Sequence, residues 1–236
     1  MLAELGVVAG CREGGVRADA FVNGGFLPEK VRGTKLAGGR SYVHLCDFYA
    51  TFCRLAGVDP ADSAAERLGL PPVDSIDMWP LFSGENLTSP RTEILFTPLH
   101  GLANASGSDP YDKTPSDMRD PMIIVGEWKL ILGVVDQCWW QGPQYPNGSS
   151  TWDTHATWIN CTTPTKKACL FNIIEDPTEH FDRAAEQPAL VDQLLARMQQ
   201  LQTTVYDPDR GKNEAEAACE AVEANKGFWG PWKQAP

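Results

Sequence analysis

The residues of this chain that could do chemistry are its cysteines, histidines and carboxylates, and their spacing fits few sites. No two of the four histidines lie close enough in sequence to form a zinc-binding pair. No Asp-Asp or Asp-Asn pair supplies the cluster of oxygens that a hard cation such as Ca²⁺ requires. Gly14 and Gly15 lack the strand-to-helix context of a phosphate-binding loop. The residues themselves therefore predict neither a metal site nor a nucleotide site.

Seven cysteines leave at least one thiol free or paired outside this chain. Cys46 and Cys53 share one face of a predicted helix but would sit ~10 Å apart along its axis, too far for a disulfide. Both are predicted to be buried thiols. Four other cysteines lie in loop-rich sequence, where the connectivity stays open and the last of them could pair outside the chain. These disulfide candidates are Cys138, Cys161, Cys169 and Cys219.

Four Asn-x-Ser/Thr sequons are candidates for N-glycosylation and indicate the secretory pathway. Their asparagines are Asn86, Asn104, Asn147 and Asn160. The first residues, Met1 to Gly10, lack the basic segment of a signal peptide and include Glu4. We therefore expect sequence that precedes Met1 to be missing.

The composition argues against two classes of partner. A formal net charge of −11 opposes binding to nucleic acid and to anionic lipid, and its simplest consequence is solubility. No stretch of about 18 consecutive apolar residues is present, so no membrane-spanning helix is expected.

The first 90 residues are predicted to hold a strand end followed by a helix. Tyr42-Val43 is typical of a strand end, and the helix after it continues to Ala56, with Gly57 placed to end it. Apolar side chains recur along this helix at the spacing of one buried face. A strand followed by a helix fits the edge of an α/β layer. The predicted buried face consists of Leu45, Phe48, Tyr49, Phe52 and Leu55.

Residues 91–236 are predicted to form a small α+β domain, separated from the first by the turn-rich stretch 83–90. Gly126-Glu127 joins two apolar runs in the pattern of a type II′ hairpin. Pro188 opens a helix whose apolar stripe ends at Leu201. Long loops are expected at 101–121 and 138–165. The segment between Asn213 and Ala224 is expected to be a helix, with a solvated tail as the alternative. The predicted strands are Glu93–Thr97, Met122–Val125, Trp128–Leu132 and Leu170–Ile173.

Several blocks of the chain resemble blocks of the arylsulfatase family, in the family's order. The resemblance implies an α/β plus α+β fold. Residues 1–90 would be the incomplete terminal piece of a large mixed α/β sulfatase domain. Residues 91–236 would be a small antiparallel sheet packed by a C-terminal helix. The ending 227–232 (GFWGPW) is similar to the tail of arylsulfatase B and its relatives. The other blocks are Glu13-Gly14-Gly15-Val16-Arg17, Tyr42 to Gly57, Asp74 to Gly84 and Leu170 to Glu179.

The family's catalytic groups are missing from these blocks. Sulfatases make a formylglycine nucleophile from the Cys or Ser of a C-x-P-x-R-type motif, and they hold Ca²⁺ with Asp and Asn side chains. No such motif occurs here, and Val8 stands where the family often has a sulfate-facing Lys. The resemblance implies that the intact parent, with Ca²⁺ and formylglycine, hydrolyses aryl or carbohydrate sulfate esters. We expect this chain alone to bind neither and to be inactive.

The resemblance also suggests roles for His100, Asp176 and Glu179. His100 could line the substrate cleft, because the small C-terminal domain of the family forms one of its walls. Asp176 and Glu179 are expected to cap or brace the chain with their carboxylates. His44, just before the first helix, is expected to be a hydrogen-bonded structural residue.

Three interpretations of so short a chain stay open. It could be a truncated stretch of a longer sulfatase, which we prefer, or one half of a split hydrolase that joins a catalytic partner chain. It could instead be a noncatalytic protein that binds sulfated glycans through an aromatic loop. All three place it in the secretory pathway, either extracellular or lysosomal. The aromatic residues of that loop are Trp139, Trp140, Trp152 and Trp158.

Overall fold

The protein is seen here in a computed structural model, which describes residues 16–18, 20–36, 41–97, 121–138, 157–205 and 215–230. Two compact units divide the chain, residues 1–205 and residues 206–236. In the first unit, helices accompany a small open antiparallel sheet, which confirms the predicted mixture of helix and strand. The boundary predicted near residue 90 stays a prediction.

The described helices and strands of the first unit follow one another in a simple order. They are η1 (Glu29–Val31), α2 (Asp47–Ala56), α3 (Ser63–Arg67), α4 (Trp79–Phe82), β1 (Glu93–Thr97), β2 (Met122–Val125), β3 (Trp128–Ile131), β4 (Val134–Cys138), β5 (Thr157–Asn160), β6 (Cys169–Asn172) and α6 (Pro188–Gln202).

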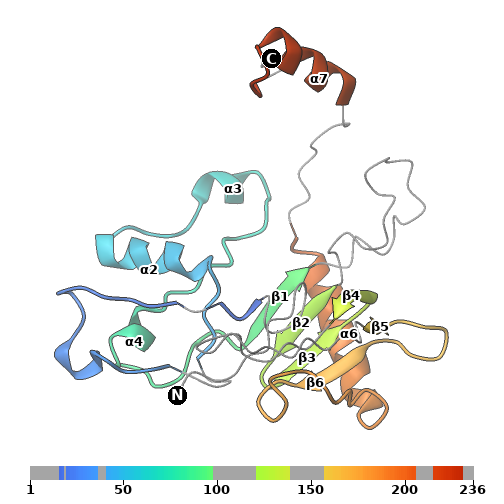
Figure 1. The fold of residues 1–236 in the computed structure, drawn as a ribbon. Coiled ribbons are helices and arrows are strands. Elements are labelled where there is room, and N and C mark those ends of the chain that lie inside the picture. The colour runs from blue at the N-terminus through green and yellow to red at the C-terminus, as the bar shows by residue number, and fades with distance from the viewer. Residues whose placement is uncertain are drawn as a thin grey trace, which may run out of the picture. The chain divides into compact units, whose positions relative to one another are not determined.

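Four antiparallel strands form the main sheet in the order β1-β2-β3-β6, as Figure 1 shows. Strands β2 and β3 make the predicted hairpin, in which Val125 pairs with Trp128 and leaves a two-residue loop. Gly126 opens that loop with a φ of 57°. A type II′ turn requires a positive φ at this position, and glycine adopts it without a steric cost. The predictions of β1 and of this hairpin are confirmed, and β6 begins one residue earlier than predicted.

Helix α6 covers one face of the sheet (Figure 1). Alternate strand residues point to this side, since side chains in a strand alternate between faces. Pro188 is the first residue of the helix, as predicted, and its missing N–H costs nothing there. The apolar stripe of the helix is buried as predicted. The packed residues of this face include Ile123, Leu130 and Leu170 from the sheet and Val191, Leu194 and Met198 from α6.

The other face of the sheet packs against an N-terminal segment and a disulfide. Tyr42 lies partly buried on this face, and its hydroxyl donates a 2.5 Å hydrogen bond to the Gly126 carbonyl. Cys161 and Cys169, two of the four disulfide candidates, are joined in a buried disulfide. The apolar core residues here are Met122, Ile124, Ile131, Phe171 and Ile173.

A second, two-stranded sheet pairs β4 with β5. The prediction of one continuous loop over 138–165 is therefore wrong at Thr157–Asn160, where the backbone is a strand and includes Trp158. The backbone of these residues is hydrogen-bonded to β4, and this pairing could not be predicted from the local composition. Trp139, Trp140 and Trp152 lie outside the described residues.

Helix α2 ends as predicted. Gly57 has a φ of 68°, and its N–H donates to the Arg54 carbonyl while the Val58 N–H donates to the Cys53 carbonyl. These two bonds form a Schellman motif, in which a left-handed glycine satisfies the last carbonyls of a helix.

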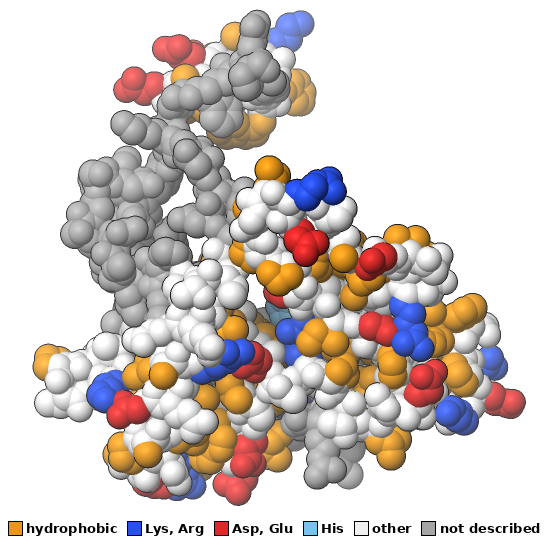
Figure 2. All heavy atoms as spheres, turned by 180° about the vertical axis from the view of Figure 1, so that it is seen from behind, with side chains coloured by type: hydrophobic (Ala, Val, Ile, Leu, Met, Phe, Trp, Pro, Cys, Tyr) orange, Lys and Arg blue, Asp and Glu red, His pale blue; other side chains and the backbone are white. Residues whose placement is uncertain are grey.

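The face that α2 buries is not the predicted one. Its buried residues are Asp47, Ala50 and Thr51, whereas Leu45 is 81% exposed and Phe52 is 61% exposed. Phe48 is the exception, since its ring lies 6.1 Å from the ring of Phe82. Figure 2 shows hydrophobic side chains at the surface of the molecule on the face seen there. The exposed members of the predicted face, which we call the α2 apolar stripe, are Leu45, Tyr49, Phe52 and Leu55.

The strand end predicted at Tyr42-Val43 is also wrong, because neither residue is in a strand. The Tyr42 carbonyl accepts a hydrogen bond from the Ser89 hydroxyl, at 2.5 Å. A side chain thus takes the place of a strand partner. Helix α4 follows, with Met78 buried just before it and Leu81 buried within it.

The second unit contains helix α7 (Ala215–Ala224), which confirms the helix predicted between Asn213 and Ala224. Phe228 and Trp229 follow it and are exposed. Among the described residues, no helix combines the length and apolar character needed to cross a bilayer.

Candidate functional site

Only part of the predicted site falls within the described residues. His100, Asn104 and Asn147 lie outside them. Asn86 lies in an exposed turn after α4, and Asn160 is the last residue of β5. The backbone of Cys138 ends β4, whereas Cys219 is an exposed free thiol of α7. Among the candidates that the structure describes, it brings together Cys161 and Cys169, with Asn160 next to Cys161 in the chain.

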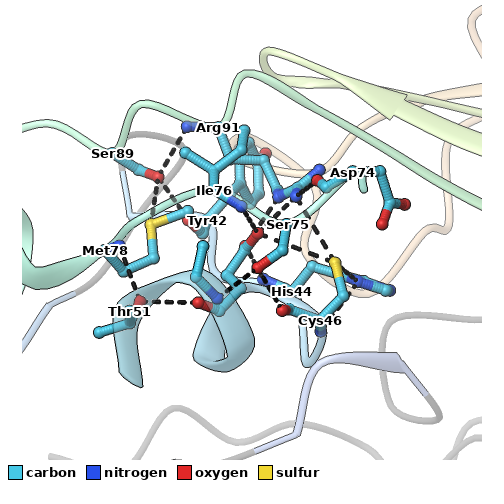
Figure 3. A network of polar contacts seen from close by, with 12 residues as sticks. Tyr42, His44, Cys46, Thr51, Asp74, Ser75, Ile76, Met78, Ser89 and Arg91 are labelled. Atoms are coloured by element: carbon cyan, nitrogen blue, oxygen red, sulfur yellow. Dashed lines mark hydrogen bonds and ion pairs between the residues drawn. The ribbon is translucent and has the colours of Figure 1, made fainter. Parts of the chain in front are cut away.

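A network of polar contacts surrounds Asp47, at the start of α2 (Figure 3). Its carboxylate is fully buried and accepts hydrogen bonds from the guanidinium of Arg91, one of them 2.7 Å long. The backbone N–H groups of His44 and Ile76 also donate to it, at 2.8 and 2.9 Å. Both carboxylate oxygens are thereby satisfied, as burial of a charge requires.

These hydrogen bonds stabilise the ionised form of the Asp47 carboxyl. Burial acts to raise the pKa of its carboxyl, since a low-dielectric surrounding disfavours the ionised form. The hydrogen bond from Arg91, the two backbone N–H groups and the positive charge of Arg91 act in the opposite direction and prevail, so the pKa is lowered. The Arg91 guanidinium is correspondingly held charged, and it also donates a 2.8 Å bond to the Asp74 carbonyl.

Hydroxyl groups around this ion pair join α2 to the chain after it (Figure 3). Ser75 donates to the Cys46 carbonyl at 2.6 Å and accepts from the Ala50 N–H at 2.8 Å. Thr51 donates to the Asp47 carbonyl and accepts from the Met78 N–H. Each hydroxyl therefore links the first turns of α2 to residues 75–78.

His44 and Cys46 have the geometry of a thiol–imidazole pair. The His44 Nδ1 and Cys46 Sγ atoms are 2.9 Å apart, within the reach that an activated cysteine needs. The environment opposes activation, however. Burial first, and then the negative charges of Asp74 and Asp47, raise the pKa of the Cys46 thiol to about 11, despite the opposing charge of Arg91. A thiol that stays protonated at neutral pH is a poor nucleophile.

A second charged pair lies within the sheet. Lys129 on β3 and Glu179, after β6, are both fully buried, and Lys129 Nζ is 2.6 Å from Glu179 Oε1. Lys129 pairs in register with Ile124 and Phe171, so it points to the face of the sheet away from α6. Asp176 caps the turn before Glu179 by accepting bonds from Thr178 and the Phe181 N–H. The expected bracing roles of Asp176 and Glu179 are confirmed.

The charged and polar groups described above stabilise the fold and do not form a catalytic or metal-binding arrangement. In the part of the chain that the structure describes, no three His, Cys, Asp or Glu residues gather as a metal site would require. The carboxylate of Asp47 is occupied by Arg91, and the thiol of Cys46 is held protonated. Neither group is placed to attack a substrate or to hold a cation.

The sequence analysis did not predict that Asp47, Arg91 and Lys129 form buried ion pairs that stabilise the fold. Lys129 carried a usable signal, because it interrupts a buried run of apolar strand residues, where an unpaired ammonium would be costly. Asp47 and Arg91 are 44 residues apart, so no local pattern connects them.

No protein-family model matches this chain. Among solved structures, it is similar to a chain described by the words "metabolism of multiple glycosaminoglycans by Bacteroides thetaiotaomicron" and labelled "6S-sulf". The two chains are 18% identical, with a TM-score of 0.37. The match covers 66% of this chain and 24% of the other, so this chain spans about a quarter of that protein's length.

Proposed function

We propose that this chain is a C-terminal portion of a sulfatase-like protein, completing the folded body of the hydrolase without supplying its catalytic groups. The resemblance of its sequence blocks to the arylsulfatase family supports the family. The parent would hydrolyse aryl or carbohydrate sulfate esters with formylglycine and Ca²⁺, which other parts of the protein would hold.

One observation carries the proposal: α2 is amphipathic in the inverted sense. Its inner side is built from Asp47, Ala50 and Thr51, and its larger apolar side chains face outward. A surface helix normally buries its apolar side and exposes its polar side. In such a helix the polar side is already hydrogen-bonded within the chain, and the apolar side is exposed. This arrangement is expected where a second layer of protein covers the apolar side.

Burying the α2 apolar stripe under a second layer of protein would stabilise the joined protein substantially. Burial of one Leu or Phe side chain gains roughly 1.5–3 kcal/mol, and a whole domain is stable by only about 5–15 kcal/mol. The four side chains of the α2 apolar stripe could therefore contribute much of the stability of a joined protein. In the isolated chain, the same stripe is a site for aggregation.

Reconstitution tests the proposal. The chain would be coexpressed with a sulfatase polypeptide that carries the C-x-P-x-R motif and ends before the block equivalent to Glu13. We expect copurification and sulfate release from a chromogenic ester by the pair, with none by this chain alone. Sulfate release by the purified chain by itself would contradict the proposal.

Variants separate docking from unspecific association. Leu45→Gln together with Phe52→Gln removes the centre of the α2 apolar stripe and is expected to abolish copurification. Leu87→Gln is the matched control, because Leu87 is 88% exposed and lies outside α2. Equal copurification of both variants would rule out docking through the stripe. Retention of the single chain on a sulfated-glycan resin, unaffected by either variant, would instead support a glycan-binding protein.

A further inference from the structure

We infer that, of the two sequons in the described residues, Asn86 accepts an N-linked glycan and Asn160 does not. The sequence treats the two alike, since both have a Thr at the third position. Their surroundings differ in the availability of that Thr hydroxyl and in the backbone around the asparagine. This inference is independent of the proposed function and requires only that the chain enters the endoplasmic reticulum.

The reaction defines what an acceptor needs. The side-chain amide nitrogen of Asn replaces a lipid pyrophosphate at C1 of an oligosaccharide donor. The C1–O bond to the pyrophosphate breaks, a C1–N bond forms, the amide loses one proton, and the lipid pyrophosphate departs. The transferring enzyme reads both the amide and the hydroxyl at the third position, so both must be available on an accessible loop.

Asn86 meets these needs. It follows α4 in a turn closed by its own N–H, which donates to the Pro80 carbonyl at 2.8 Å. Asn86, Leu87 and Thr88 are all exposed, and Leu87 is 88% exposed. Neither the Asn86 amide nor the Thr88 hydroxyl makes a hydrogen bond to another described residue. The turn is held by its backbone, so an attached glycan displaces no side-chain contact.

The turn is also anchored without the help of the sequon. Gly84 has a φ of 70°, and its carbonyl accepts a 3.2 Å hydrogen bond from Lys30. Ser83 is buried and donates to the Glu85 carboxylate at 3.0 Å. Asn86 can therefore carry a large group outward while the residues before it keep their places.

Asn160 is exposed as well, but the rest of its sequon is occupied. The Thr162 hydroxyl accepts from the Gly133 N–H at 2.9 Å and donates to the Lys167 carbonyl at 3.1 Å. The middle residue, Cys161, is fully buried and bonded to Cys169. Asn160 itself pairs with Val134 in a strand ladder. The Thr162 hydroxyl that the enzyme must bind is thus already hydrogen-bonded, and the backbone of the sequon is held by strand pairing and by the disulfide.

Site-resolved mass spectrometry tests the inference. The full chain would be expressed in eukaryotic cells behind a cleavable signal sequence, and total cellular and secreted protein would be collected. Glycan removal by an amidase in heavy-oxygen water then labels each asparagine that carried a glycan. We expect the label at Asn86 in most molecules and little or none at Asn160. An unlabelled Asn86, or comparable labelling of both sites with the disulfide intact, would overturn the inference.

Three variants sharpen the result. Asn86→Gln and Thr88→Ala should each remove the Asn86 glycan, whereas Thr88→Ser should keep it. Cys169→Ser should raise labelling of Asn160 several-fold, because it frees Cys161 and loosens the strand end. No change at Asn160 in that variant would show that the disulfide does not protect the site and would refute that half of the inference.

Discussion

The guanidinium of Arg91 donates hydrogen bonds to both carboxylate oxygens of Asp47, although the two residues are 44 positions apart in the chain. Arg91 lies just before β1 and Asp47 begins α2, so the pair joins the helical part of the first unit to its sheet. Its side chains are only 11% and 0% exposed. A bidentate pair shielded from water in this way is far stronger than a surface ion pair.

Arg91→Ala should therefore lower the free energy of unfolding by about 3–5 kcal/mol, because it leaves the buried carboxylate of Asp47 without its cation. Urea denaturation measures the loss. Arg54→Ala is the control, since Arg54 pairs with Asp77 at the surface and such pairs contribute about 0–1 kcal/mol. Equal losses in the two variants would mean that Arg91 does not stabilise the fold through Asp47.

The same pair predicts how stability changes in acid. The pKa of Asp47 in the folded protein lies below its ordinary value of 3.8, so the unfolded chain takes up this proton first as the pH falls. Asp47 therefore stabilises the fold above pH 3.8, and this contribution is lost as the pH drops through the folded-state pKa. Urea midpoints between neutral pH and about pH 3 should fall less steeply in Asp47→Asn than in the wild type. Parallel curves would contradict the prediction.

Glu93 should add to the same acid sensitivity. The hydrogen bond from Arg197 is the main cause that lowers the pKa of Glu93 below 4.5, and burial opposes it only in part. Glu93→Gln is expected to flatten the curve at slightly higher pH than Asp47→Asn does. A pH profile identical to that of the wild type would show that this pair does not contribute.

The thiol of Cys46 should react slowly despite its nearby imidazole. With a pKa raised to about 11, it would be ionised in roughly one molecule in a thousand at about pH 8. Alkylation by iodoacetamide, followed by peptide mass spectrometry, should modify the exposed Cys219 well before Cys46. Faster labelling of Cys46 than of Cys219 would indicate an activated cysteine.

Elements that depend on local signals could be predicted from the sequence. Gly126 requires a turn, Pro188 begins a helix and Gly57 ends one, and each acts on its immediate neighbours. The face that α2 buries could not be predicted, because it depends on partners distant in sequence. Asp47 is buried because it accepts hydrogen bonds from Arg91 and from the Ile76 N–H. These bonds decide which face of α2 is buried, against the prediction from the apolar spacing of Leu45 and its neighbours.

The candidate site could be predicted less well than the fold. Pairing of Cys161 with Cys169 followed from neither spacing nor composition, because four loop cysteines allow several connectivities. The difference between Asn86 and Asn160 arises from strand pairing of β5 with β4, which the sequence did not reveal.

The buried pair of Lys129 and Glu179 supports a last prediction. Lys129→Met should destabilise the protein by about 3–5 kcal/mol, because a carboxylate buried in the sheet core loses its cation at 2.6 Å. Lys129→Met combined with Glu179→Leu should recover most of that loss, since replacing both charges by apolar groups of similar volume avoids the desolvation cost. Thermal and urea unfolding of the three proteins measure both effects. A double variant less stable than Lys129→Met would show that Glu179 contributes through other contacts and not mainly through its pairing with Lys129.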